Sequence, residues 1–169
     1  MLSMKHHIAQ VNIALMRASL DDPLMAEFVA SLDEINTLAD SSPGFVWRLQ
    51  TAQGNATDLR PYDDDRILFN LSVWESFEQL QAYVYKSAHG EVMRKRRKWF
   101  EKFEGMYFAL WWVEAGHIPS VTEAKQRLDY LNKHGVSEWA FNFKRPFPSP
   151  DQASEEFTAP PFDLCPAAE

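Results

Sequence analysis

The sequence predicts an α+β protein in which helices cover one β-sheet. Three segments, 8–13, 44–50 and 69–74, alternate between apolar and polar residues, as half-buried strands do. Between them, apolar residues recur every three or four positions, which is typical of amphipathic helices. At 169 residues and 46% hydrophobic content, the chain is large enough for one core. We therefore expect a single domain over residues 1–148 and a proline-rich tail over 149–169.

Alternation divides the strands into two faces. The oily face carries Val11, Ile13, Phe69, Leu71 and Val73. The mixed face carries Gln10, Asn12, Asn70, Ser72 and Trp74. Apolar groups around a few hydrogen-bonding side chains are typical of a small-molecule pocket, so the mixed face is the candidate binding surface.

The segment 44–50 repeats this pattern. Phe45, Trp47 and Leu49 fall on one side, whereas Arg48 falls on the other side with Val46 and Gln50. The alternation thus predicts that Arg48 joins the mixed face.

The remaining elements follow in order. Asp22 and Pro23 predict the start of a first helix, which carries Leu24, Phe28, Leu32, Ile35 and Ala39 on its apolar side. After a polar loop at 53–65 and the strand at 69–74, a second helix begins near Phe77, is interrupted at Gly90 and continues over 91–103. Residues 107–114 predict a fourth strand. The order β-α-β-β-α-β fits a ferredoxin-like sandwich, whose uncovered sheet face needs a second subunit as cover.

Beyond this core, Ser120 and Glu123 have capping-box spacing, and Gly135 predicts the end of a third helix. Residues 138–143 predict an edge strand. The tail is expected to be extended, and Phe147, Phe157 and Phe162 are its candidates for docking on a surface or a partner.

Charge and composition exclude several classes of function. A net charge of −7 disfavours binding to nucleic acid and to anionic membranes. The N-terminus shows no secretory signal, so we expect a cytoplasmic protein. The single cysteine and the lack of metal-ligand spacing among five histidines predict no disulfide framework and no bound metal. The absence of a G-x-S-x-G elbow and a P-loop makes hydrolase and nucleoside-triphosphatase functions weak candidates.

Several long motifs resemble those of the bacterial family numbered 3291 among domains of unknown function, over about residues 7–148. They are PGFVWRLQ, NATDLR, NLSVWES, YVYKSAHGEVMRKRRKWF, LWWVEAGHIP and EAKQRLDYLNKHG. The family looks like a branch of the dimeric α+β barrel superfamily, which includes antibiotic-biosynthesis monooxygenases and haem-degrading monooxygenases. The resemblance implies a homodimer in which the mixed faces line a barrel and the oily faces meet each subunit's own helices.

Haem-degrading relatives use a first-strand asparagine with a tryptophan and a histidine on the second core helix. Asn12 matches the asparagine, Tyr83 stands near the expected tryptophan, and His89 matches the histidine only with an insertion. His89 is a candidate proton carrier or haem ligand, or it caps the helix break before Gly90. The resemblance thus keeps haem as an alternative to a site without a cofactor.

Other candidates also have structural alternatives. Arg48 holds a substrate carboxylate or phenolate, or it pairs with a protein acid such as Glu114. His117 faces the pocket mouth or orients nearby backbone. Most tryptophans fill core or interface volume, although Trp74 and one of Trp111 and Trp112 are candidates to stack on a flat ligand. The basic run 94–98 is expected to be solvated, in part paired with the acids at 63–65.

These observations favour a protein that binds a small, partly aromatic or polyketide-like metabolite. If the protein is an enzyme, we expect a cofactor-independent monooxygenase-like or isomerase-like reaction, in which Asn12 and Arg48 stabilise a substrate anion and His89 moves a proton. The substrate-binding candidates are Gln10, Asn70, Ser72, Trp74, Tyr83, Trp112 and His117. The alternatives are a haem-binding or haem-degrading protein and a non-catalytic ligand-binding or interaction module.

Overall fold

The strands and helices follow the predicted order. A computed structural model describes residues 5–51, 54, 57 and 59–152, and at residues 88 and 89 it describes the backbone alone. In chain order, the elements are β1 (His6–Met16), α1 (Ala26–Ser41), β2 (Phe45–Arg48), β3 (Ile67–Trp74), α2 (Phe77–Lys86), α3 (Ala88–Lys95), β4 (Phe100–Glu101), β5 (Phe108–Glu114) and α4 (Val121–His134). No helix within the described ranges combines the length and the apolar character needed to cross a bilayer.

The sheet has the strand order of a ferredoxin-like fold. β1 lies between β3 and β5, and β2 pairs with the outer edge of β3, all antiparallel. The short β4 extends the β5 side by pairing with the last residues of β1, Leu15 and Met16. The predicted β-α-β-β-α-β order is therefore confirmed, with β4 as an addition.

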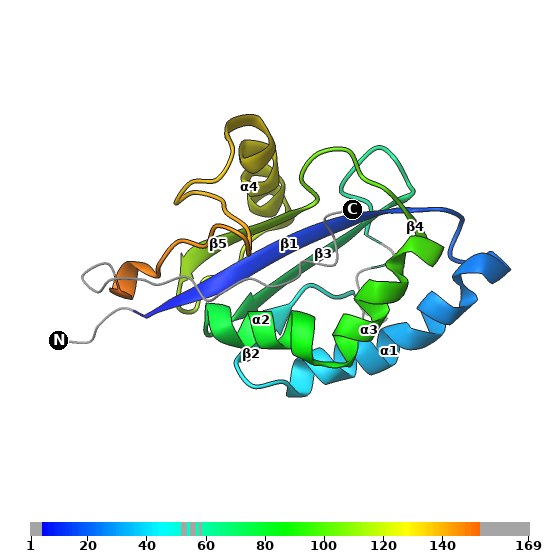
Figure 1. Ribbon diagram of the computed structural model, residues 1–169, viewed down its shortest axis with the longest axis horizontal. Coiled ribbons are helices and arrows are strands. Elements are labelled where there is room, and N and C mark those ends of the chain that lie inside the picture. The colour runs from blue at the N-terminus through cyan, green and yellow to red at the C-terminus, as the bar shows by residue number, and fades with distance from the viewer. Residues whose placement is uncertain (1–4, 52–53, 55–56, 58, 153–169) are drawn as a thin grey trace.

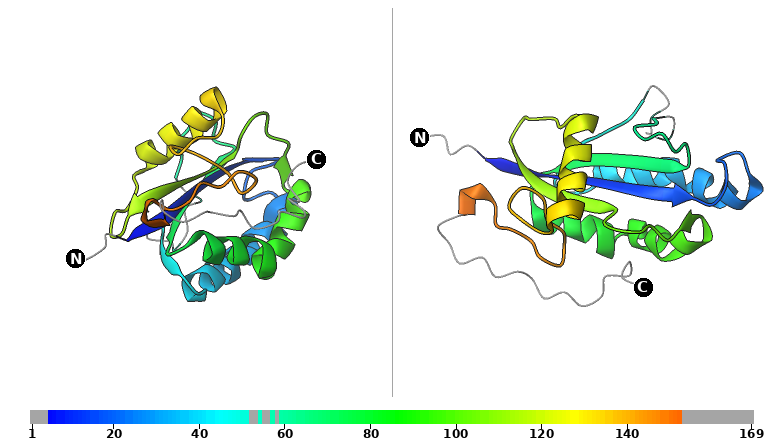
Figure 2. Two further views of the ribbon diagram at one scale, coloured as in Figure 1. Left: turned by 60° about the vertical axis from the view of Figure 1, so that its left-hand side comes forward. Right: turned by 90° about the horizontal axis from the view of Figure 1, so that it is seen from above.

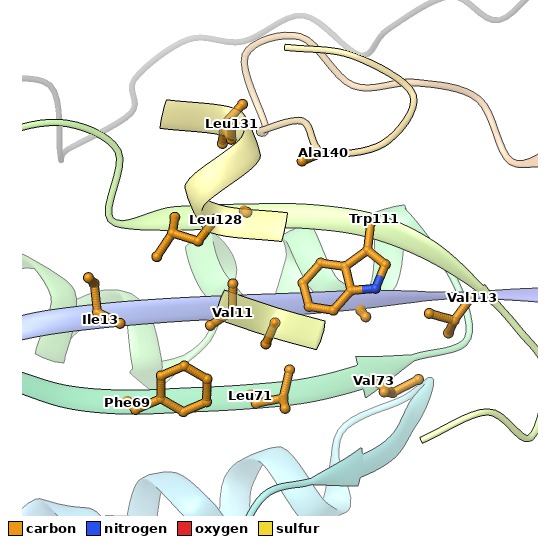
Figure 3. Close-up of a cluster of buried hydrophobic side chains, with 13 residues drawn as sticks. Val11, Ile13, Phe69, Leu71, Val73, Trp111, Val113, Leu128, Leu131 and Ala140 are labelled. Carbon is orange, nitrogen blue, oxygen red and sulfur yellow. The ribbon is translucent and has the colours of Figure 1, made fainter. Parts of the chain in front are cut away.

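Helices lie on both faces of the sheet. In Figure 1 and in the left view of Figure 2, α4 lies on one side, and α1, α2 and α3 lie together on the other. The oily face packs under α4, where Leu128 and Leu131 contact Val11, Leu71 and Trp111 in one buried cluster (Figure 3). The segment before β3 adds Tyr62 to this cluster, so the described chain covers the face itself.

The expected environment of the mixed face is therefore wrong, whereas the oily face does meet a helix of its own chain, α4. The resemblance implied that the mixed face would look into a barrel between subunits, but it looks toward α1, α2 and α3 of the same chain, where Ile8 and Trp74 pack with Ala39, Phe77 and Leu80. An uncovered sheet face was the reason to expect a second subunit. That reason does not apply, since α4 covers the face.

Local signals place the helix ends as expected. The Asp22 carboxylate accepts a 2.9 Å hydrogen bond from the Leu24 amide, which starts a 3-10 turn, Pro23–Met25, that leads into α1. The Ser120 hydroxyl accepts a 3.1 Å hydrogen bond from the Glu123 amide at the start of α4. Gly135 ends α4 with φ of +78°, a conformation that glycine adopts without strain.

Three boundaries differ from the sequence predictions. The second helix breaks at Ser87 rather than at Gly90, which lies inside α3. Helical structure ends at Lys98 and not at residue 103. The predicted edge strand at 138–143 is reduced to a bridge between Leu110 and Phe141, because the chain turns away after one pair of backbone hydrogen bonds.

The described start of the tail docks on the domain. Phe147 packs on Phe141 with ring centroids 5.8 Å apart, and its carbonyl accepts a hydrogen bond from Trp112. Residues Pro150–Gln152 form a 3-10 turn, in which Asp151 accepts hydrogen bonds from the backbone and ring of His6. The hydrogen bond from His6 holds the pKa of Asp151 below its usual range. Phe157 and Phe162 lie outside the described residues.

Candidate functional site

A cavity of about 840 Å³ lies between the mixed face and the helices that cover it. The strands supply a polar floor, and α1 supplies an apolar wall from Phe28, Leu32, Ile35 and Ala39, the stripe that the sequence predicted as the buried side of this helix. Leu24 does not join this wall, because it belongs to the preceding 3-10 turn and is 49% exposed. α2 and α3 close the opposite side with Leu80, Tyr83, Val84, Val92 and Met93. The cavity therefore lies within one chain.

The floor of the cavity is a hydrogen-bonded row of side chains from β1 and β3. The Gln10 amide nitrogen donates to Asn70 Oδ1 at 2.9 Å and to Ser72 Oγ at 2.8 Å. The Asn12 amide donates to Gln10 Oε1 at 3.2 Å, and the Trp74 indole donates to Ser72 Oγ at 3.0 Å. Strand pairing brings these residues together, since Gln10 is opposite Ser72 and Asn12 is opposite Asn70. All five residues of the predicted mixed face share this row.

Gln10 and Asn70 differ in their exposure to the cavity, and this difference decides which of them can reach a ligand. Gln10 is buried, and its amide is fully engaged by its neighbours. Asn70 is exposed at the cavity, and within the described residues its amide N–H groups donate to no other side chain or backbone carbonyl. Asn70 is thus the most accessible donor on the floor, and Asn12, which is half-buried, also has an N–H beyond the one it donates to Gln10.

Aromatic rings form one end of the cavity. Tyr83 stacks on Trp74 with ring centroids 4.8 Å apart, and Phe45 meets Trp74 edge-on at 5.5 Å. Burial raises the pKa of the Tyr83 phenol well above its usual range, so this group stays protonated at neutral pH. Its hydroxyl reaches toward the Ile35 carbonyl of α1 at 3.4 Å.

Phe45 contacts Trp74 because β2 contains a bulge. The pairing between β2 and β3 shifts between Phe45 and Trp47, so these two side chains lie on opposite faces. The sequence predicted that Phe45, Trp47 and Leu49 share one face. Only Trp47 and Leu49 pack with the oily cluster, whereas Phe45 packs with the Trp74 cluster.

Arg48 lines the cavity but is already paired. Its Nε and Nη2 donate to the two carboxylate oxygens of Asp40 at 2.7 and 3.2 Å, and its Nη1 donates to the Gly54 carbonyl at 2.7 Å. The Arg48 side chain is 10% exposed and that of Asp40 is 46% exposed. Of the two alternatives, the pairing with a protein acid is therefore found, with Asp40 in place of Glu114.

Three other candidates lie differently. His117 is outside the cavity lining, and its Nε2 lies 2.8 Å from the Glu123 carboxylate, a local contact with a side chain in place of the expected contact with backbone. Trp112 also lies outside the lining and donates to the Phe147 carbonyl, whereas Trp111 is buried under α4 and donates to Glu123 at 3.1 Å. His89 belongs to the first turn of α3, but its side chain lies outside the described residues.

The pattern of charges predicts that the basic run 94–98 is solvated surface, but part of it lies at the cavity. Arg96 and Arg97 line the cavity together with Arg17, which follows β1. Lys95 and Lys98 pair with Glu27 of α1 at 3.1 and 3.9 Å, not with the acids at 63–65, where Asp64 pairs with Arg66. The sequence did contain a signal for this division, because residues 95 and 98 lie on one face of a helix and residue 96 lies on another.

The tryptophans mostly fill the core, as expected. Trp99 and Trp111 are buried. Trp139 is an exception at 51% exposure, where its ring stacks on the Arg127 guanidinium at 3.5 Å.

The described cavity residues do not fit haem well. The lining contains no histidine or cysteine among them, and its tyrosines Tyr83, Tyr85 and Tyr107 pack against Trp74, Phe143 and Arg96. Within the described part of the chain, His, Cys, Asp and Glu side chains form no group of three that could hold a metal ion. The geometry therefore gives the haem alternative no support.

Two of the solved structures that resemble this chain do so at low sequence identity. One is an asparagine-to-alanine variant of SnoaB, a cofactor-independent oxygenase from Streptomyces nogalater, at 15% identity and a TM-score of 0.44, over 66% of this chain and 95% of that one. The other is NE2512, a protein of unknown function from Nitrosomonas europaea, at 12% identity and a TM-score of 0.42, over 70% of this chain and 99% of that one. We infer no function from either, because both TM-scores lie below 0.5.

The family comparison covers most of the chain. None of the curated proteins matches this chain. The model of a domain of unknown function, DUF3291, matches residues 7–157, which extends past the boundary at 148 expected from the sequence and takes in the docked start of the tail. The chain belongs to the DUF3291 family.

Proposed function

We propose that the protein binds a small, flat, mainly apolar molecule in the cavity between the sheet and α1–α3. The observation that carries this proposal is the cavity itself, with aliphatic and aromatic walls above one row of hydrogen-bonded amides. Such a combination suits a ligand with an aromatic body and a carbonyl or hydroxyl oxygen. The ligand would stack near Trp74 and accept a hydrogen bond from Asn70 or Asn12.

The enzymatic form of the proposal is oxidation by O₂ without a cofactor. A substrate methylene that is conjugated with a ketone through an aromatic ring loses a proton, and amide donors on the floor stabilise the resulting oxyanion. The carbanion adds O₂ to give a hydroperoxide, which loses water and leaves a carbonyl, so that CH₂ and O₂ become C=O and H₂O. We assign the proton transfer to His89, which precedes the cavity residues Val92 and Met93 by three and four positions on α3.

We propose a structural role for Arg48 in place of the substrate-binding role that the sequence suggested. Its charge is balanced by Asp40 and its fork is occupied, so we propose that Arg48 fixes β2 against the end of α1. Stabilisation of the substrate anion then falls to Asn12 and Asn70.

Matched substitutions on α1 test whether the cavity binds ligand. Leu32 lines the cavity, whereas Val29 lies outside the lining and is 40% exposed. Leu32→Trp places a larger ring in the cavity and should weaken binding of anthrone, a flat ketone with an acidic methylene, while Val29→Trp should leave it unchanged. Fluorescence titration reports binding, and an oxygen electrode with detection of anthraquinone reports turnover. Binding without oxygen uptake would leave a ligand-binding protein, and absence of binding in the unsubstituted chain would contradict the proposal.

The homodimer stays a prediction. Its support is the resemblance to a superfamily of dimers, and the oily face is not available for it, since α4 covers that face. Light scattering across a range of concentrations tests it, and a mass of one chain throughout would contradict it.

A further inference from the structure

The cavity is surrounded by positive charge in a chain of net charge −7. Its lining includes one acidic residue among those described, Glu101. The cationic residues of the lining are Arg17, Arg48, Arg96, Arg97, Lys102 and Lys144. Asp40 balances Arg48, so the excess charge lies with the others. A local reversal of sign at a cavity attracts an oppositely charged ligand.

Arg96 is the best placed of these cations. Its guanidinium lies over the ring of Tyr107 with 4.5 Å between Cζ and the ring centroid, a contact that restricts its orientation. It is half-buried, and within the described residues no carboxylate lies within 4 Å of it. Its neighbours Lys95 and Lys98 have a partner in Glu27, so Arg96 differs from the rest of the run.

Arg17 approaches from the end of β1. Its Nε donates to the Arg97 carbonyl at 2.9 Å, and its backbone amide donates to the Trp99 carbonyl at 2.8 Å. These bonds hold Arg17 beside the same segment that carries Arg96. Like Arg96, Arg17 pairs with no carboxylate among the described residues.

We propose that the ligand of the cavity is an aromatic carboxylate, with its ring system between the sheet and α1 and its carboxylate at Arg96 and Arg17. This inference rests on the proposed function, because it assigns a charge to the same ligand. A guanidinium offers two parallel N–H donors that match a carboxylate, which is why arginine rather than lysine suits this end of the cavity. The amides of the floor bind a second, uncharged oxygen of the same ligand.

A matched pair of probes tests the charge. 2-Naphthoate and 2-naphthamide have the same ring system and nearly the same shape, but only the first is an anion. We expect the full chain to bind 2-naphthoate about tenfold more tightly than 2-naphthamide, measured by isothermal titration calorimetry. Arg96→Gln should remove this preference and leave the affinity for 2-naphthamide unchanged.

Arg94→Gln is the control, because Arg94 belongs to the same basic run but lies outside the cavity lining and is exposed. It should alter neither affinity. Arg17→Gln, at an exposed position, gives a second test that does not depend on how Arg96→Gln folds, and it should also weaken 2-naphthoate selectively. Equal binding of both probes, or an equal effect of Arg94→Gln, would overturn the anionic ligand but not the proposed function. Failure to bind either probe would overturn the anionic ligand, and the proposed function would fall with it only if the chain also failed to bind anthrone.

Discussion

The indole nitrogen of Trp74 donates a 3.0 Å hydrogen bond to the hydroxyl of Ser72, two residues earlier on the same face of β3. The same hydroxyl accepts a 2.8 Å hydrogen bond from Gln10 on β1. Ser72 therefore joins the aromatic end of the cavity to its amide floor. Both donors are buried, so neither can turn to water when the hydroxyl is removed.

Ser72→Ala should destabilise the fold by about 1–3 kcal/mol, because it leaves the Trp74 indole N–H and one Gln10 N–H without an acceptor. Urea unfolding measures the loss. The same substitution in a Trp74→Phe background should cost less, since the indole donor is absent there. Equal costs in the two backgrounds would show that the bond between Trp74 and Ser72 contributes nothing measurable.

Arg48 and Asp40 connect β2 to the last turn of α1, and we expect each to depend on the other. Arg48→Ala and Asp40→Ala should each lower the free energy of unfolding, and a double-mutant cycle should give a coupling of about 1 kcal/mol. We expect a small coupling energy because Asp40 is 46% exposed, and solvent screens the attraction between the two charges. If Arg48→Ala abolished ligand binding while leaving stability unchanged, Arg48 would be the anion clamp that the sequence first suggested.

Alternation predicted which residues share a face but not what covers each face. Gln10, Asn12, Asn70, Ser72 and Trp74 form one row because side chains of a strand alternate and because β1 pairs with β3 in that register. The pattern is symmetric with respect to the two sides, so it did not show that α1–α3 would take the mixed face. That choice follows from long-range packing, in which the oily face packs against Ala124, Leu128 and Leu131 of α4.

Two further features lay beyond sequence reasoning for the same reason. The bulge in β2 places Phe45 against Trp74, and no glycine or proline inside the strand marks it. The choice of Asp40 as the partner of Arg48 depends on how the turn between α1 and β2 brings the two together. Helix ends were easier, because Asp22, Ser120 and Gly135 act on their own neighbours.

Leu128 of α4 tests the cover of the oily face. It is 1% exposed and packs in the cluster with Val11 and Leu71, so Leu128→Ala should cost about 2–5 kcal/mol of stability. Ile118, just before α4, is 44% exposed, and Ile118→Ala should change stability by less than about 0.5 kcal/mol. Thermal and urea unfolding distinguish these outcomes. A loss at Leu128 as small as that at Ile118 would mean that α4 does not pack on the sheet in solution.

Tyr62 lies over Phe69 at the same face, and its buried hydroxyl has no hydrogen-bond partner among the described residues. Burial, followed by the charge of Asp129, raises the pKa of the phenol from 10.0 to about 12. The folded protein therefore keeps this proton to higher pH than the unfolded chain. Ionisation of Tyr62 then favours the unfolded chain, so the free energy of unfolding falls as pH rises from about 10 to about 12.

Tyr62→Phe removes both the unpartnered hydroxyl and the titrating group. At neutral pH it should stabilise the fold by about 1 kcal/mol, because a buried polar group without a partner is removed. Above pH 10 its advantage over the unsubstituted chain should widen, since it has no phenol to ionise. Tyr130→Phe, at an exposed position, is the control for removing a tyrosine hydroxyl, and at neutral pH it should change stability by less than about 0.5 kcal/mol. Urea unfolding at a series of pH values measures both, and a Tyr62→Phe difference that stays constant above pH 10 would show that Tyr62 ionises as easily in the folded chain as in the unfolded one.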